Sequence, residues 1–138
     1  MKIIDLLESK ESKKFTLIDV LDEFVPFVAN KFKFKKFPSI KLALQIDDDE
    51  QPTFGRYIGE EGVIHLAIEH RHPLDILRTL AHELTHYMQD TKNMLGPHSG
   101  ETGSREENQA NYVAGIIMRE FNRAHPEFFN ILPVLQSK

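Results

Sequence analysis

Two histidines and a glutamate in the sequence His82-Glu83-Leu84-Thr85-His86 are the residues best suited to chemistry. Residues four apart on an α-helix lie one turn apart on the same face, so both imidazoles can reach one ion. Zinc binds histidine nitrogen at roughly 2.0–2.1 Å, and a catalytic zinc site keeps one coordination position open for water. Glu83 follows the first histidine directly, where its carboxylate can take a proton from that water. The spacing therefore predicts a metal site with a general base beside it.

A third metal ligand is expected from a second segment, in which Glu107 and Asn111 are four residues apart and share a helical face with Ala110. A small residue beside the ligand would let this segment approach the first helix closely. Glu107 is the predicted ligand, and Glu106 is the alternative. Asn111 is expected to bond the free ring nitrogen of a ligating histidine, preferably His82, because such nitrogens need a partner.

The spacing of apolar residues predicts which elements carry these side chains. Pro73 favours a helix start, and Ser104 with Glu107 has the spacing of a capping box. The expected elements are N-terminal helices within 1–35, an antiparallel β-meander over 40–68, with a loop or turn at 47–52, a helix bearing the two histidines over 73–91, a helix bearing Glu107 over 105–123, and a short C-terminal helix within 127–136. This order predicts an α+β fold in a single domain, 1–138.

Composition limits the kinds of site that the chain can build. It has 138 residues, no cysteine and a formal net charge of −4. Disulfides, thiolate zinc sites and cysteine nucleophiles are therefore excluded. The acidic balance, with a pI near 6.0, argues against a protein built mainly to hold nucleic acid.

Targeting signals are not evident in the sequence. Asp5 and Glu8 interrupt the short apolar stretch at the N-terminus, which is wrong for a signal peptide. No apolar run approaches the roughly 20 residues that span a bilayer. A cytoplasmic protein without a membrane partner is expected.

Two other patterns suggest different chemistry. Glu69-x-x-His72 and Glu83-x-x-His86 are ExxH units of the kind used by di-iron proteins, but those sites need four long helices, and here the first unit runs straight into Pro73. Basic and aromatic residues alternate over Lys31–Phe37, which could bind a nucleic-acid strand by charge and stacking. The preferred interpretation is an amphipathic segment with Phe inward and Lys in water.

The pair formed by HELTH (82–86) and E-N-Q-A-N (107–111) resembles the gluzincin metallopeptidases, most of all the small ImmA/IrrE-type proteins. The stretch 40–89 is also similar to SprT-like and other minimal zincins. Thr85 stands where many of these proteins carry Gly. The resemblance implies a minimal zincin fold and one Zn²⁺ per chain, and it implies hydrolysis of a protein or peptide substrate with Glu83 as the base.

Other parts of such a site stay open. Another donor to the oxyanion is needed besides the metal, and His98, Tyr57 and Tyr112 are the candidates. Strand 63–68 precedes the metal helix, so its free edge is expected to hold an extended substrate peptide. The alternative to a peptidase is a non-catalytic, metal-stabilised binding module, against which the presence of Glu83 argues.

Overall fold

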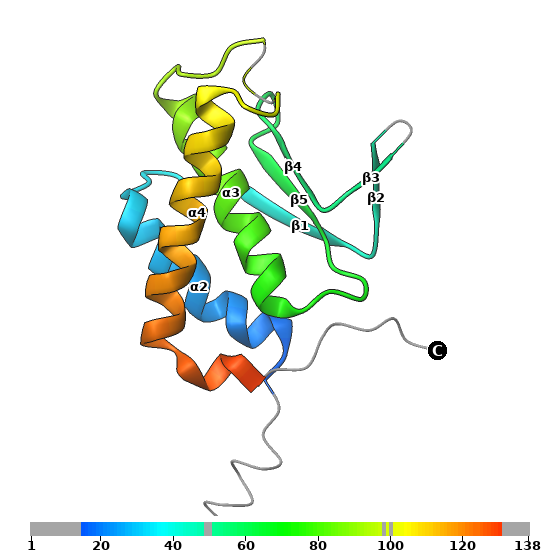
Figure 1. Cartoon of the computed structure of the whole chain (residues 1–138), viewed down its shortest axis with the longest axis vertical. Helices are drawn as coiled ribbons and strands as arrows, with labels where there is room; N and C mark the ends of the chain where they lie inside the picture. Colours follow the sequence, from blue (N-terminus) through cyan, green and yellow to red (C-terminus); the bar gives the residue numbers. More distant parts are fainter. Residues whose placement is uncertain (1–14, 49–50, 98, 100, 131–138) are drawn as a thin grey trace, which may run out of the picture.

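One long helix, five short strands and then two long helices follow one another in the computed structural model, which describes residues 15–48, 51–97, 99 and 101–130 (Figure 1). The helices are α2 (Leu17–Phe32), α3 (Pro73–Thr91), α4 (Arg105–Ala124) and the 3₁₀ helix η1 (Pro126–Asn130). The strands are β1 (Ser39–Ala43), β2 (Ile46–Asp48), β3 (Gln51–Thr53), β4 (Gly55–Ile58) and β5 (Val63–Ala67). The α+β class is thus confirmed. The helix expected at 2–9 and the tail beyond 130 lie outside the described residues.

The main sheet differs from the predicted antiparallel meander. Its order is β1-β5-β4, with β5 antiparallel to β4 but parallel to β1. Strand β5 takes the centre because four of its five residues are buried, which suits a strand covered on both faces. The expectation that 63–68 offers a free edge is therefore wrong, since both edges of β5 are paired. The edge strand next to α3 is β4.

The segment between β1 and β4 also differs from the expected loop. The two short strands β2 and β3 form a separate two-stranded antiparallel sheet, in which Ile46 lies opposite Thr53. The alternating apolar residues of 40–46 therefore belong to two strands and not to one, because β1 ends at Ala43 and Ile46 begins β2.

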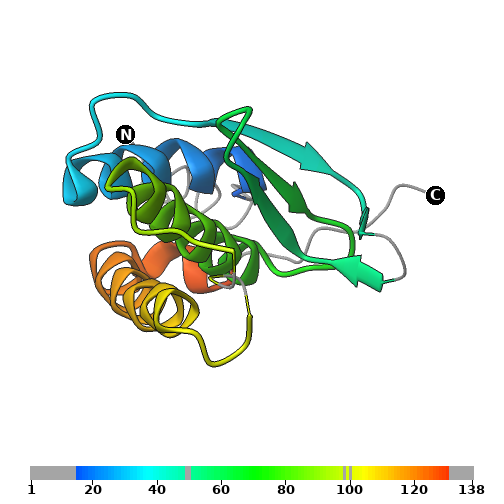
Figure 2. The same ribbon diagram turned by 90° about the horizontal axis from the view of Figure 1, so that it is seen from above.

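Helix α3 lies at the centre of the molecule, between the sheet and α4, with α2 packed alongside (Figures 1 and 2). Its buried residues include Ile76, Leu77, Leu80, Ala81 and Leu84. Because α3 contacts the sheet and both other long helices, the residues on its remaining face are held in a rigid setting.

Local signals explain where the helices begin. Thr16 and Asp19 form a complete capping box at the start of α2, and Pro26 lies within this helix without ending it. His72 caps α3, and its Nδ1 accepts the Leu74 N–H. Ser104 caps α4 by accepting the Glu107 N–H.

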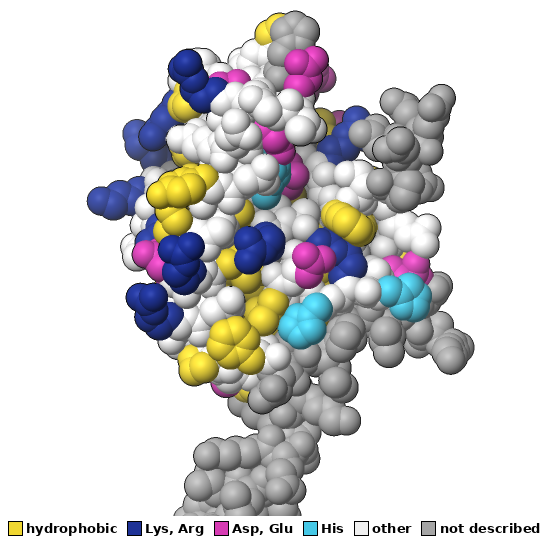
Figure 3. All heavy atoms as spheres, viewed as in Figure 1, with side chains coloured by type: hydrophobic (Ala, Val, Ile, Leu, Met, Phe, Trp, Pro, Cys, Tyr) yellow, Lys and Arg dark blue, Asp and Glu magenta, His cyan; other side chains and the backbone are white. Residues whose placement is uncertain are grey.

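The Lys31–Phe37 segment follows the amphipathic interpretation. Phe32, Phe34 and Phe37 are packed against the core, while the four lysines of this segment are exposed. The Phe34 ring meets Tyr87 edge to face with 5.0 Å between centroids. The three rings are partly buried in this packing, which reduces the aromatic surface left for base stacking. In Figure 3, Lys and Arg side chains gather over the α2 and α4 side of the visible face.

Within the described residues, no helix has both the length and the apolar character needed to cross a membrane.

Candidate metal centre

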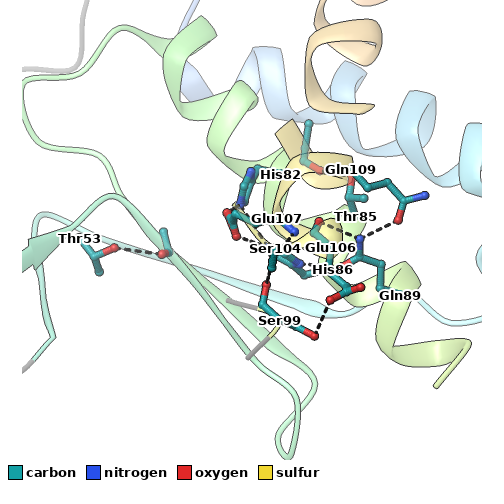
Figure 4. Close-up of polar contacts among 12 residues, drawn as sticks. Thr53, His82, Thr85, His86, Gln89, Ser99, Ser104, Glu106, Glu107 and Gln109 are labelled. Carbon is teal, nitrogen blue, oxygen red and sulfur yellow. Dashed lines mark hydrogen bonds and ion pairs between the residues drawn. The ribbon is translucent and has the colours of Figure 1, made fainter. Parts of the chain in front are cut away.

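Helices α3 and α4 bring three potential metal ligands together (Figure 4). Glu107 Oε1 lies 2.6 Å from His82 Nε2, and Glu107 Oε2 lies 3.2 Å from His86 Nε2. The two imidazole Nε2 atoms are 3.2 Å apart. The three side chains that the sequence assigns as ligands therefore converge on one point.

These distances fit a single metal ion. A tetrahedral ion with bonds of about 2.0–2.1 Å holds its ligand atoms roughly 3.3 Å apart. The two ring nitrogens are 3.2 Å apart, and His86 Nε2 is 3.2 Å from Glu107 Oε2. His82 Nε2 is closer to the other carboxylate oxygen, Oε1, because these two atoms share a direct hydrogen bond. The two facing ring nitrogens cannot both donate a hydrogen to each other, whereas both can bind one cation through their lone pairs. The group could therefore hold a metal ion, and it is the one such cluster among the described residues.

The position of Glu107 depends on the local structure of α4. The predicted capping box forms only by half: Ser104 accepts the Glu107 N–H, but the Glu107 carboxylate turns to the histidines instead of to the Ser104 backbone. Buried Ala110 and Ala114 lie on the same face and let α4 approach α3. Glu106 is directed elsewhere, because it accepts a hydrogen bond of 3.0 Å from Ser99 Oγ.

Each histidine has a second polar partner. The Asn111 side chain is hydrogen-bonded to His82, the residue that the sequence favours as its partner. Gln89 contacts His86, with 2.8 Å between Gln89 Oε1 and His86 Nδ1.

Gln89 is a site residue that the sequence analysis misses. It has no exposed surface, and its Nε2 donates to the Glu106 carbonyl and to Gln109 Oε1 at 3.0 and 2.7 Å. Since both amide hydrogens are used, Gln89 Oε1 accepts from His86 Nδ1–H, which leaves the Nε2 lone pair of His86 for a metal ion. The available sequence signal is its position, three residues after His86 on the buried side of α3.

Replacing Gln89 with Leu is expected to weaken metal binding by about 10–100-fold, because His86 loses the contact that sets its tautomer and ring orientation. Q89E is the matched comparison, since it keeps an acceptor for His86 Nδ1–H but loses both amide N–H donors, to the Glu106 carbonyl and to Gln109. Competition titration with a chromogenic zinc chelator measures both. Equal affinity in Q89L and wild type would contradict this role.

The Glu83 carboxylate lies beside the ligand group. Burial raises its pKa to about 7, and the charge of Glu107 adds to the rise. His86 and the Tyr57 N–H, which donates to this carboxylate, act in the opposite direction. Burial lowers the pKa of His82, which favours the neutral imidazole that a metal requires.

An open cleft runs past the ligand group between β4 and α4. It has two hollows of about 380 and 520 Å³, which share Thr53, Gly55, His82 and Glu83 in their walls. Strand β4 lies so close to α3 that a Cβ at Gly55 would collide with Thr79 Cγ2. Histidine and acidic side chains are visible between the α4 side and the sheet side in Figure 3.

Two of the three candidate oxyanion donors, Tyr57 and Tyr112, are not brought into this cleft in a usable form. The Tyr57 hydroxyl donates to Asp90 Oδ2 at 2.5 Å. Tyr112 is 71% exposed and lines neither hollow. His98 lies outside the described residues.

The di-iron alternative has no support in the geometry. Gln45 Nε2 donates to Glu69 Oε1 at 2.6 Å, and His72 Nδ1 caps α3. Neither side chain joins the ligand group of His82, His86 and Glu107.

Comparisons of the chain with models of protein families, with curated proteins and with solved structures found no match. A functional assignment therefore depends on the residues and geometry of the site.

Proposed function

We propose that this protein is a zinc-dependent metallopeptidase of the gluzincin type. The observation that carries the proposal is the convergence of His82, His86 and Glu107 in an open cleft, with Glu83 next to the first of them. The resemblance of HELTH (82–86) and E-N-Q-A-N (107–111) to the gluzincin pattern supports the same assignment.

Three residues would hold the ion, and a fourth would move protons. Zinc bound by two imidazoles and a carboxylate polarises a substrate carbonyl and lowers the pKa of a bound water towards about 7. Glu83 is oriented by the Tyr57 N–H, accepts a proton from the attacking water and passes it to the leaving amine.

The outer edge of β4 suits an extended peptide. Ala67 N–H donates to the Phe54 carbonyl at 2.9 Å, so the antiparallel alternation turns the backbone groups of Gly55 and Tyr57 away from β5. Of these groups, the Tyr57 N–H donates to Glu83 and the Gly55 carbonyl accepts from Thr53 Oγ1, which leaves the Gly55 N–H and the Tyr57 carbonyl for a substrate strand. No strand in the described ranges pairs with that edge. A substrate strand can therefore add to β4 by main-chain hydrogen bonds, in place of the edge expected on 63–68.

A non-catalytic, metal-stabilised module is the competing function. A structural zinc site closes all four coordination positions with protein ligands. Only three ligand groups converge among the described residues, and Glu83 would have no task in such a site. These two observations favour the peptidase.

The zinc-loaded protein is expected to cleave an unfolded protein substrate, to stop when a chelator removes the metal, and to recover with one equivalent of zinc. H86A purified in parallel controls for contaminating proteases. Absence of cleavage across unfolded proteins and a peptide library would contradict the peptidase and favour the binding module.

A further inference from the structure

Arg78 lies in the cleft and has no partner among the residues that the structure describes. It is exposed on α3, four residues before His82, and it lines the 380 Å³ hollow. Within the described residues, Arg78 makes no hydrogen bond or ion pair. Its charge is therefore available to a ligand.

The neighbouring Arg71 shows what a structural arginine looks like in this fold. Arg71 is only 7% exposed, and its guanidinium donates to the Asp75 carboxylate, to the Thr79 hydroxyl and to three backbone carbonyls. This network ties the start of β4 to α3. Arg78 takes no part in it.

The position of Arg78 relative to the ligand group follows from how β4 runs along α3. Gly55 of β4 lies beside Thr79 and Glu83 of α3, and the hydroxyl of Tyr57, two residues later in β4, reaches Asp90 of α3. Strand β4 and helix α3 therefore run in the same direction past the ligand group. Four helical residues span about 6 Å. An extended peptide advances about 3.3 Å per residue. A group held by Arg78 therefore lies within about two residues of the bond at the ligand group.

This hollow holds one basic group that has no ion-pair partner. Among the described residues that line it, Arg78 is the one Lys or Arg, and the carboxylate in the same walls, Glu83, accepts from the Tyr57 N–H and forms no ion pair with Arg78. Phe54, 65% exposed at the rim, adds an apolar surface for the methylene groups of a side chain. A free guanidinium binds a carboxylate with two parallel hydrogen bonds.

We propose that Arg78 makes the cleft selective for substrates carrying a carboxylate within about two residues of the cleaved bond, an inference that rests on the proposed peptidase function. The carboxylate is either an Asp or Glu side chain or the C-terminus of the substrate. The first would give an endopeptidase with acidic preference, and the second a carboxypeptidase.

The test uses one peptide scaffold with Glu, Gln or Lys at single positions on both sides of the cleaved bond, each made with a free or an amidated C-terminus. At one of these positions, the peptide with Glu is expected to be cleaved with a kcat/KM about tenfold higher than the peptide with Gln, which corresponds to about 1.4 kcal/mol. If the C-terminus is the ligand, free-acid peptides instead exceed their amides by a similar factor. Metal content and the thermal midpoint of each variant are measured alongside.

R78A is expected to remove this preference, and R78E to turn it towards Lys. R119A is the matched control, because Arg119 is an exposed arginine of α4 that lines neither hollow, and it should keep the preference. Cleavage without any carboxylate preference, or a preference that R78A retains, overturns the inference while leaving the peptidase intact. Failure of the zinc-loaded wild type to cleave any peptide overturns both.

Discussion

The E83Q variant is expected to keep its metal ion and its fold while turnover falls by a factor of about 10²–10⁴. Glutamine has nearly the shape of glutamate, and its amide oxygen can still accept the Tyr57 N–H that orients Glu83. It cannot accept the proton of the attacking water. Peptide turnover and bound zinc are measured on the same preparation.

E106Q is the control for this substitution. Glu106 is a neighbouring carboxylate of the cleft region, but it accepts from Ser99 and does not contact either histidine. The E106Q variant should cleave peptides at the same rate as the wild type. Full activity in E83Q with unchanged metal content would exclude Glu83 as the base.

Removal of a ligand is expected to have the other large effect. H86A and E107A should fall from about one equivalent of bound zinc to almost none, because two remaining ligands hold zinc weakly. Ligand binding stabilises the folded state by about 4 kcal/mol when free zinc is a thousandfold above its Kd. Wild type should therefore unfold at a higher temperature with zinc, and the two variants should not.

The thermal shift has its own control in E106Q, which keeps all three ligands and should respond to zinc as wild type does. A zinc-dependent shift of equal size in E107A would show that the ion binds elsewhere.

The helical part of the site is predictable because its geometry is local. His82 and His86 share a face of α3 through helical spacing alone. Glu107 reaches them only because α4 packs on α3, and the small residue Ala110 is the sequence signal for that contact. The structure thus brings together the three residues that the sequence selects as ligands.

The sheet order is not predictable in the same way. Alternating apolar residues indicate a strand but not its neighbours, so the parallel pairing of β1 with β5 requires the tertiary structure. The nearly continuous apolar sequence of β5 is the one signal that it is a central strand and not an edge.

Polar contacts between helices are also hidden from the sequence. Gln89 carries no diagnostic spacing of its own, and its role appears only when α4 supplies the Glu106 carbonyl and Gln109. The turn of Glu107 away from its capping box has the same origin, because a ligand partner on α3 replaces the local one.

Anomalous diffraction at the zinc edge, from crystals of the zinc-loaded wild type, tests the metal centre most directly. We expect one peak per chain at about 2.0–2.1 Å from His82 Nε2, His86 Nε2 and a carboxylate oxygen of Glu107, with one coordination position taken by water. A chain without a peak there after zinc loading, a pair of metal ions, or a fourth protein ligand in place of the water would contradict this account.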